Sequence, residues 1–214
     1  MKARLVILIS GGGSNLQAFI DAVAAGQLDA HIALVISNRP DVRGLERAAQ
    51  AGIPTAVLDH TRFSDRAEFD RALMALIDRQ QPDAVILAGF MRILTADFVN
   101  HYLGKLFNIH PSLLPKYPGL HTHQRAIDNG DREAGATVHF VVPELDAGAH
   151  IIQAAVPLLP DDDADTLARR VLVKEHRIYP LAVKWFLEKR LRLTDNGAQL
   201  DGALLPASGF IYTD

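Results

Sequence analysis

An amide and an imidazole stand two residues apart at Asn108 and His110, at the end of the apolar run 105–109. Alternate residues of a strand share a face, so the two side chains are expected to project together. Pro111 has no backbone N–H to donate, which favours the end of the strand there. Histidine is the usual acid or base near neutral pH, and an amide can donate to a developing oxyanion. The pair suits a tetrahedral intermediate at a carbonyl carbon, although a buried histidine bonded to backbone would give the same spacing.

A glycine-rich segment, Ser10-Gly11-Gly12-Gly13-Ser14-Asn15, lies between a β-branched apolar run and a stretch with helical periodicity. Glycines let the backbone approach an anion, and the N–H groups of a helix start point toward it. A dinucleotide fingerprint would need glycine at position 16, which is leucine, and a P-loop lysine is also absent. The segment therefore predicts a monophosphate site, with a tight turn that binds nothing as the alternative.

Several charged residues are weaker candidates. Asp146 lies in a polar segment between two apolar runs, where it could pair with His110 or simply accept hydrogen bonds within a turn. Arg66 and Arg92 could each hold a substrate carboxylate through two hydrogen bonds, although Arg66 is equally typical of a solvated surface charge. Glu175 could meet a substrate amine or hydroxyl, but a carboxylate on a long helix is usually solvated.

Apolar residues flank Arg92 on both sides, at Phe90-Met91 and Ile93-Leu94. They could form a bed for an aromatic ring or belong to the ordinary core. Four histidines invite a metal hypothesis, namely His110, His121, His123 and His139. No carboxylate lies near them in the sequence, so no metal is expected. The chain also lacks cysteine and a G-x-S-x-G elbow, which favours direct group transfer over a covalent enzyme intermediate.

Composition limits the broad class. The chain has 214 residues, 49% of them hydrophobic and 22% charged, which is ordinary for a globular protein with a sizeable core. The net charge of −3 without long basic runs argues against nucleic-acid binding. No cysteine is present, so disulfides are excluded, and no signal peptide or membrane span is recognisable. The plain expectation is a cytoplasmic protein, monomeric or homodimeric.

Strands and helices alternate over the first 110 residues in the hydrophobic pattern. Expected strands cover residues 3–9, 31–36, 55–58, 84–88 and 105–109. Expected helices cover 16–25, 41–51, a segment from 64 or 65 to before Pro82, and 95–102, with caps from Ser14 or Asn15, Asp41, Ser64 or Asp65, and Thr95. This alternation predicts an α/β fold with an open, mostly parallel, doubly wound (Rossmann-like) sheet that has helices on both faces.

The pattern changes after Pro111. Pro111, Pro115 and Pro118 punctuate a long loop, and Thr122 is expected to cap a short helix, 123–129. Runs 136–142 and 150–156 predict an antiparallel extension of the sheet. A long C-terminal helix should begin in the acidic segment 161–165, kink near Pro180 and end near Lys189 and Arg190. The end of the chain predicts a hairpin, 192–193 with 199–200, whose type I′ turn is Asn196-Gly197.

Taken together, these segments resemble a known family, the glycinamide ribonucleotide formyltransferases of purine biosynthesis. The resemblance spans nearly the whole chain, and its most specific part is the run Phe107-Asn108-Ile109-His110-Pro111-Ser112-Leu113-Leu114-Pro115. The other matching segments are Leu8 to Asn15, Ala88 to Leu94, Tyr117 to His123, Val138-His139-Phe140, Glu144-Leu145-Asp146 and Glu175-His176. The family often has asparagine where this chain has Gly12.

The resemblance implies an activity and a set of site residues. 10-Formyltetrahydrofolate, as co-substrate, would donate its formyl group to the amine of glycinamide ribonucleotide, without a metal. The implied catalytic residues are Asn108, His110 and Asp146. The implied ribonucleotide-binding residues are Gly12, Gly13, Ser14, Asn15 and Glu175. The implied folate-binding residues are Arg66, Met91, Arg92, Ile93, Leu94, Asn108, Val142, Pro143, Glu144, Leu145 and Asp146.

The resemblance also implies a domain organisation. Residues 1–104 would form a Rossmann-like phosphate-binding lobe, and 105–214 a catalytic and folate-binding lobe with the C-terminal helix, together one compact formyltransferase domain. The Leu114-Pro115 bond is expected to be cis. Related methionyl-tRNA formyltransferases and formyltetrahydrofolate hydrolases carry an extra domain for which this chain has no room. The remaining rivals are hydrolysis of the formyl donor, a nucleotide-binding regulatory module and a zinc site.

Overall fold

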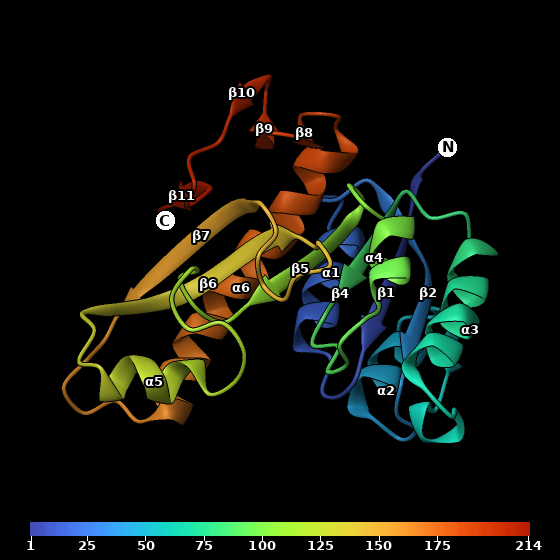
Figure 1. The fold of residues 1–214 in the computed structure, drawn as a ribbon, viewed down its shortest axis with the longest axis horizontal. Helices are drawn as coiled ribbons and strands as arrows, with labels where there is room; N and C mark the ends of the chain where they lie inside the picture. Colours follow the sequence, from blue (N-terminus) through green and yellow to red (C-terminus); the bar gives the residue numbers. More distant parts are fainter. The chain divides into compact units, whose positions relative to one another are not determined.

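The computed structural model describes residues 1–214, which form two compact units, Met1–Phe107 and Asn108–Asp214. Figure 1 shows the elements of both. The boundary falls inside strand β5 (Leu106–His110), so Asn108 and His110 belong to the second unit.

The first unit is built from a parallel sheet with the strand order β4-β1-β2-β3. Its strands are β1 (Ala3–Ile9), β2 (Ala30–Ser37), β3 (Thr55–Val57) and β4 (Ala84–Leu87). Its helices are α1 (Ser14–Ala24), α2 (Arg43–Gln50), the short 3-10 helix η1 (His60–Arg62), α3 (Arg66–Asp78) and α4 (Ala96–His101). Residues 5–9 of β1 are fully buried, as expected for a central strand covered on both faces.

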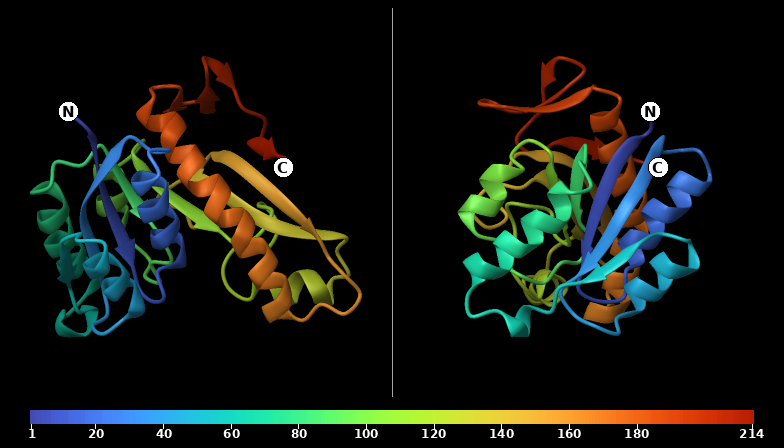
Figure 2. Two further views of the ribbon diagram at one scale, coloured as in Figure 1. Left: turned by 180° about the vertical axis from the view of Figure 1, so that it is seen from behind. Right: turned by 90° about the vertical axis from the view of Figure 1, so that its right-hand side faces the viewer.

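Helices cover both faces of this sheet. The right-hand view of Figure 2 shows α1 and α2 on one side of β1 and β2 and α3 on the other. The expected doubly wound, mostly parallel arrangement is confirmed. Asp65 and Thr95 cap α3 and α4 as expected, each accepting from a backbone N–H three residues on.

Two other expected caps were wrong because of the backbone conformation. Gly13, in the left-handed region with φ 73°, precedes the first turn of α1, so Ser14 and Asn15 already lie inside the helix. Asp41 is itself left-handed, with φ 56°, and Val42 takes the cap position of α2 without a side-chain hydrogen bond. Both helices begin where a loop conformation, and not a side chain, sets the geometry.

The second unit contains the antiparallel pair β6 (Glu133–Phe140) and β7 (His150–Pro157), as expected. The long helix α6 (Ala164–Leu187) packs against both strands and includes Pro180. The remaining elements are α5 (Thr122–Asp128), β8 (Leu191–Thr194), β9 (Gly197–Leu200), β10 (Ala203–Leu204) and β11 (Phe210–Tyr212). A capping box formed by Asp163 and Thr166 starts α6, in agreement with the acidic beginning expected there.

Three details of the second unit correct the expectations. His121, left-handed with φ 57°, is the N-cap of α5, and the Thr122 hydroxyl donates instead to the Pro111 carbonyl at 2.7 Å. The C-terminal hairpin is present, but Gly197 pairs with Thr194, so the two turn residues are Asp195 and Asn196. Neither has the positive φ that a type I′ turn requires. Strand β11, which lies parallel to β7, was not expected at all.

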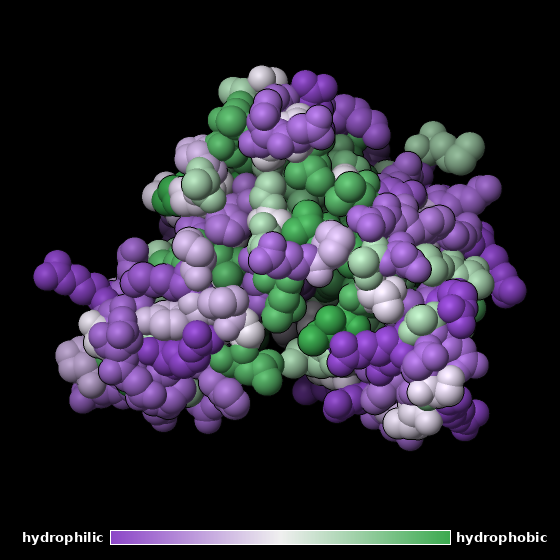
Figure 3. Space-filling model, viewed as in Figure 1, coloured by the Kyte–Doolittle hydropathy of each residue, from purple (hydrophilic) through white to green (hydrophobic).

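The Leu114-Pro115 peptide bond is cis, as the family resemblance implied. None of the helices combines the length and the apolar character that a membrane crossing requires. Figure 3 shows hydrophobic residues exposed among hydrophilic ones on the viewed face. In the molecule as a whole, the large hydrophobic residues with exposed side chains include Met91, Ile93 and Leu145, each more than half exposed.

Candidate active site

The end of β5 places Asn108 and His110 in the second unit, two residues apart on one strand. His110 is 6% exposed, and its Nδ1 atom lies 3.6 Å from Oδ2 of Asp146. The Asp146 side chain is itself 6% exposed. The carboxylate that sequence reasoning could only suggest therefore lies within ion-pair distance of the imidazole, although 36 positions of the chain separate them.

The tautomer of His110 follows from its second contact. Its Nε2 atom lies 2.7 Å from the carbonyl oxygen of Tyr117, which can only accept, so Nε2 carries a hydrogen and donates. The remaining nitrogen, Nδ1, is the one that gains or loses a proton, and it faces Asp146. The site is thus arranged for proton exchange at one defined atom.

Asp146 is held in the loop 141–149, which connects β6 to β7. Its Oδ2 atom accepts a hydrogen bond from the backbone N–H of Gly119 at 3.0 Å. Its backbone has φ 52°, a left-handed conformation that aspartate tolerates better than most residues but that still costs free energy. The loop therefore fixes the carboxylate toward His110 at some expense in backbone strain.

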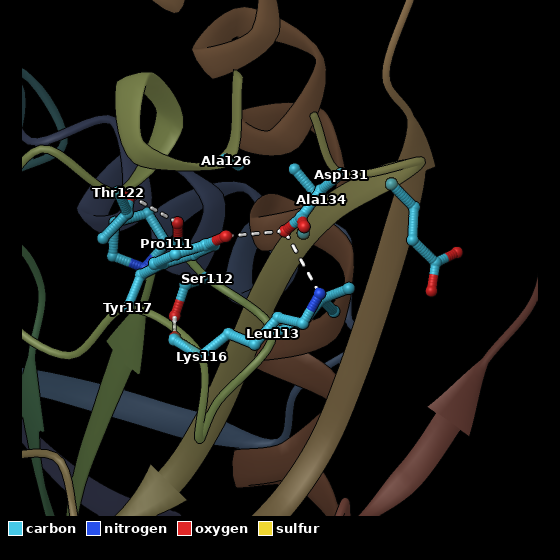
Figure 4. Close-up of a pocket in the computed structure, with 11 residues that line it drawn as sticks. Pro111, Ser112, Leu113, Lys116, Tyr117, Thr122, Ala126, Asp131 and Ala134 are labelled. Atoms are coloured by element: carbon cyan, nitrogen blue, oxygen red, sulfur yellow. Dashed lines mark hydrogen bonds and ion pairs between the residues drawn. The ribbon is translucent and has the colours of Figure 1, made fainter. Parts of the chain in front are cut away.

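The loop after β5 supports the carbonyl that accepts from His110. Figure 4 shows Tyr117 and Lys116 both directed at Asp131, and the Tyr117 hydroxyl donates to Oδ2 of Asp131 at 2.9 Å. The Ser112 hydroxyl donates to the Lys116 carbonyl, and Thr122 donates to the Pro111 carbonyl. These contacts fix Tyr117 from several sides, so the orientation of the imidazole does not depend on a free loop.

His139, on β6, contacts the amide of Asn108. Its Nδ1 atom lies 2.9 Å from the carbonyl oxygen of Phe140, so Nδ1–H donates there and Nε2 keeps its lone pair. The Asn108 Nδ2 atom lies 3.3 Å from this Nε2 and donates to it. Burial lowers the pKa of His139 to about 4, so the ring stays neutral near pH 7 and remains an acceptor. His139 thereby sets which way the Asn108 amide points.

Sequence reasoning missed this contact. It treated His139 only as a metal-ligand candidate, and the apolar neighbours Val138 and Phe140 gave the one usable signal, a polar residue in a buried strand. The structure contains no group of three or more His, Cys, Asp or Glu side chains placed to hold a metal ion.

The pKa of His139 gives a testable dependence of stability on pH. The unfolded chain takes up a proton near the ordinary pKa of 6.5, whereas folded His139 does so only near 4. The free energy of unfolding should therefore fall as the pH drops through this window, by about 2 kcal/mol between pH 7 and 4.5 from this group alone. Urea unfolding of the wild type and of His139→Gln at both pH values measures it.

The His139→Gln variant keeps the other titrating groups near this ring, which are Asp146, His150 and His110. The wild type should therefore lose more stability than the variant on acidification, and the difference is the contribution of His139. Equal losses in the two proteins would contradict the neutral, buried assignment.

In the first unit, the glycine-rich loop follows β1 and starts α1, as expected. Gly13 is left-handed, and a Cβ atom at that position would lie 2.7 Å from the Cα of Gly44, so only glycine fits there. Asn15 is buried, whereas Gly12 is exposed. The backbone at a helix start, free of bulky side chains, is what an anion site needs.

The loop after β4 carries the apolar residues Met91 and Ile93, which are 62% and 52% exposed. These side chains are therefore available to a ligand and are not part of the core. The Met91 N–H donates to the Ser10 hydroxyl at 2.8 Å, which ties this loop to the end of β1. The Arg92 guanidinium lies over the Phe69 ring, 4.5 Å from its centroid. Arg66 is exposed at the start of α3.

Glu175 is 7% exposed, so the expected default of a solvated carboxylate on α6 was wrong. It is one of the buried residues of α6, the helix that packs against β6 and β7. The residues from Val142 to Leu145 are half-buried or exposed and precede Asp146 in the same loop.

Comparison with known proteins decides the family. A family model described as formyl transferase matches residues 3–183. The phosphoribosylglycinamide formyltransferase of Escherichia coli (strain K12) is 53% identical over 206 residues, covering 96% of this chain and 97% of that protein. The chain belongs to the formyl transferase family. The enzyme of the same name from Haemophilus influenzae is 51% identical to this formyltransferase, over 97% of this chain and 98% of that protein.

A solved structure agrees with this assignment. The phosphoribosylglycinamide formyltransferase of Coxiella burnetii, in complex with CHES, superposes on this formyltransferase with a TM-score of 0.96. It is 47% identical and each chain covers 100% of the other. The protein is therefore an enzyme that transfers a formyl group, and the fold expected from the sequence is that of its solved relative.

Proposed function

We propose that this formyltransferase transfers the formyl group of 10-formyltetrahydrofolate to the amine of glycinamide ribonucleotide, in de novo purine biosynthesis. The observation that carries the proposal is the 3.6 Å approach of His110 Nδ1 to Asp146, beside Asn108 on the same strand. The near full-length similarity to enzymes named phosphoribosylglycinamide formyltransferase supports the choice of acceptor.

The proposed chemistry is direct transfer through a tetrahedral intermediate. The neutral amine attacks the formyl carbon, and the carbonyl oxygen becomes an oxyanion. Protonated His110, through Nδ1–H, and the Asn108 amide stabilise that oxyanion. Asp146 holds the imidazolium and takes the amine proton, directly or through a water molecule. As the oxyanion re-forms the carbonyl group, the bond from the formyl carbon to N10 of the folate breaks, and N10 takes the proton that Asp146 received from the amine.

The proposed binding residues fall into a ribonucleotide group and a folate group. Gly12, Gly13, Ser14 and Asn15 would bind the phosphate through backbone N–H groups, and Glu175 would contact the ribonucleotide. The folate would contact Arg66, Met91, Arg92, Ile93, Leu94, Asn108 and the segment Val142, Pro143, Glu144, Leu145 and Asp146. The exposure of Met91, Ile93 and Leu145 supports this part, because large apolar side chains left in water suit a flat aromatic ligand.

The deciding experiment measures the fate of the formyl group. Purified protein is given 10-formyltetrahydrofolate with and without glycinamide ribonucleotide, and formylated product and free formate are both quantified. We expect donor consumption to require the ribonucleotide and to match the formylated product one for one. Formate release at the same rate without an acceptor would identify a hydrolase instead, and ligand binding without turnover would identify a regulatory module.

A further inference from the structure

Three successive carbonyl groups of the glycine-rich loop each accept a hydrogen bond from a different donor. The Gly11 carbonyl accepts from the Gly44 N–H at 3.0 Å, and the Gly13 carbonyl accepts from the Gln17 N–H at 2.9 Å. The Gly12 carbonyl accepts from Nε of Arg47 at 2.8 Å. Two of these three bonds join backbone to backbone, and only the middle one depends on a side chain.

The direction of these carbonyls fixes the direction of the N–H groups. In a planar trans peptide the C=O of one residue and the N–H of the next point in opposite directions. The N–H groups of Gly12, Gly13 and Ser14 are therefore turned away from the donors on α1 and α2. Consecutive N–H groups aimed to one side form the kind of concavity that binds an anion.

The peptide that joins Gly12 to Gly13 is the weak point of this arrangement. Glycine on both sides lets such a peptide rotate at little cost. A Cβ atom added at Gly12 would meet no atom within 4 Å, so the residue is open on that side. The Arg47 bond is the contact that keeps the Gly12 carbonyl turned toward α2 and the following N–H turned away.

Arg47 is suited to this task by its own contacts. Its Nη1 atom donates to Oε1 of Gln17 at 3.3 Å, so the guanidinium holds two acceptors at once, one in the loop and one on α1. Gln17 in turn donates to Asp21 at 2.9 Å, which holds the amide in place. The planar fork of arginine meets two acceptors with fixed geometry, which the single ammonium of lysine does not.

We propose that Arg47 is a positioning residue that orients the Gly12-Gly13 peptide for phosphate binding. The inference rests on the proposed function, because it assumes that the loop binds the ribonucleotide phosphate. It assigns Arg47 no contact with the reacting atoms. Loss of Arg47 should therefore weaken the binding of phosphate esters and leave the chemical step alone.

The test compares Arg47→Gln and Arg47→Lys with Arg43→Gln, which removes the same charge from an exposed position of the same helix. Calorimetry measures the affinity for ribose 5-phosphate and for inorganic phosphate. A charge-assisted hydrogen bond predicts about tenfold weaker binding for both Arg47 variants, with Arg43→Gln within about twofold of the wild type. Arg47→Lys keeping wild-type affinity would contradict the inference, because lysine keeps the charge but not the fork.

Two further measurements separate orientation from charge. The loss of affinity caused by Arg47→Gln should persist at high salt. Salt would screen a direct attraction between the Arg47 charge and the phosphate, so a loss due to that attraction would disappear. Alanine at position 12 makes the backbone less free. In a Gly12→Ala background, the factor by which Arg47→Gln lowers the affinity should therefore be smaller than in the wild type, by about threefold or more. A loss that vanishes in high salt, or one that is undiminished by Gly12→Ala, would overturn the positioning role.

Kinetics provide the last comparison. Arg47→Gln should raise KM for the ribonucleotide about tenfold, with kcat and KM for the formyl donor within about twofold. Binding of ribose 5-phosphate does not require turnover, so the two proposals can fail separately. A wild type that binds it through Arg47 but does not formylate the ribonucleotide would overturn only the proposed function. Unchanged affinity in Arg47→Gln, or no affinity for ribose 5-phosphate in the wild type, would overturn only the inference, because the proposed function is judged by formyl transfer to the ribonucleotide.

Discussion

Replacement of His110 by alanine is expected to lower kcat by about 10²–10⁴-fold, the usual contribution of a positioned acid or base. Only one imidazole nitrogen can act on the substrate, because Nε2–H is committed to the Tyr117 carbonyl. That nitrogen is Nδ1, which faces Asp146. Alanine removes the proton donor at that atom and leaves the Asp146 carboxylate without its partner. The loss should appear in kcat with both substrates saturating, since His110 is not among the proposed phosphate or folate contacts.

The measurement is steady-state formyl transfer, with circular dichroism and thermal unfolding as tests of folding. His31→Ala is a matched control, because His31 is exposed on β2 in the first unit. It should turn over like the wild type. If folded His110→Ala retained near-normal kcat, the proposed mechanism would be wrong, whatever the family of the protein.

The second large effect is expected at Asn108. Removal of one oxyanion donor costs about 10²–10³-fold in kcat, so Asn108→Ala should fall in that range. The Asn108 amide can donate to the oxyanion in only one of its two orientations. The hydrogen bond from its Nδ2 atom to His139 Nε2 selects the orientation. The effect should therefore lie in the chemical step, measured as a single-turnover rate with enzyme in excess.

Asn108→Asp sharpens this prediction, because aspartate keeps the shape of asparagine and replaces the donor by a second acceptor. A carboxylate oxygen repels both the oxyanion and the lone pair of His139 Nε2, so the loss should be at least as large as that of alanine. If Asn108→Asp turned over like the wild type, Asn108 would fill space and would not donate to the transition state.

Much of the first unit could be predicted because its signals are local. Residues 3–9 form a continuous apolar run bounded by glycines, and such a run is readily assigned to a buried parallel strand. The caps at Asp65 and Thr95 were predicted for the same reason, since a capping side chain acts within three residues. The starts of α1, α2 and α5 were not, because left-handed residues at Gly13, Asp41 and His121 set them.

Longer-range features were less accessible. Strand β11 spans only Phe210–Tyr212 and forms a strand only by pairing with β7, which is distant in the sequence. The contact of His139 with Asn108 joins two strands and carries no local signature. Residue types and spacing proposed Asn108 and His110 as a catalytic pair and Asp146 as a possible partner of His110, but left the structural alternatives open. The family resemblance implied all three as catalytic residues, and the distances among them follow from how the loop 141–149 folds back.

The loop that carries Asp146 returns to β7 through Gly148, where a Cβ atom would lie 1.6 Å from the carbonyl oxygen of Phe140. That oxygen is the acceptor that fixes the His139 tautomer, and His139 in turn orients Asn108. A side chain at Gly148 would therefore disturb the orientation of Asn108 through two intervening residues, Phe140 and His139. Gly148 has no side chain and is not among the proposed substrate contacts, yet its substitution should lower activity in a mutational survey as substitution of a catalytic residue does.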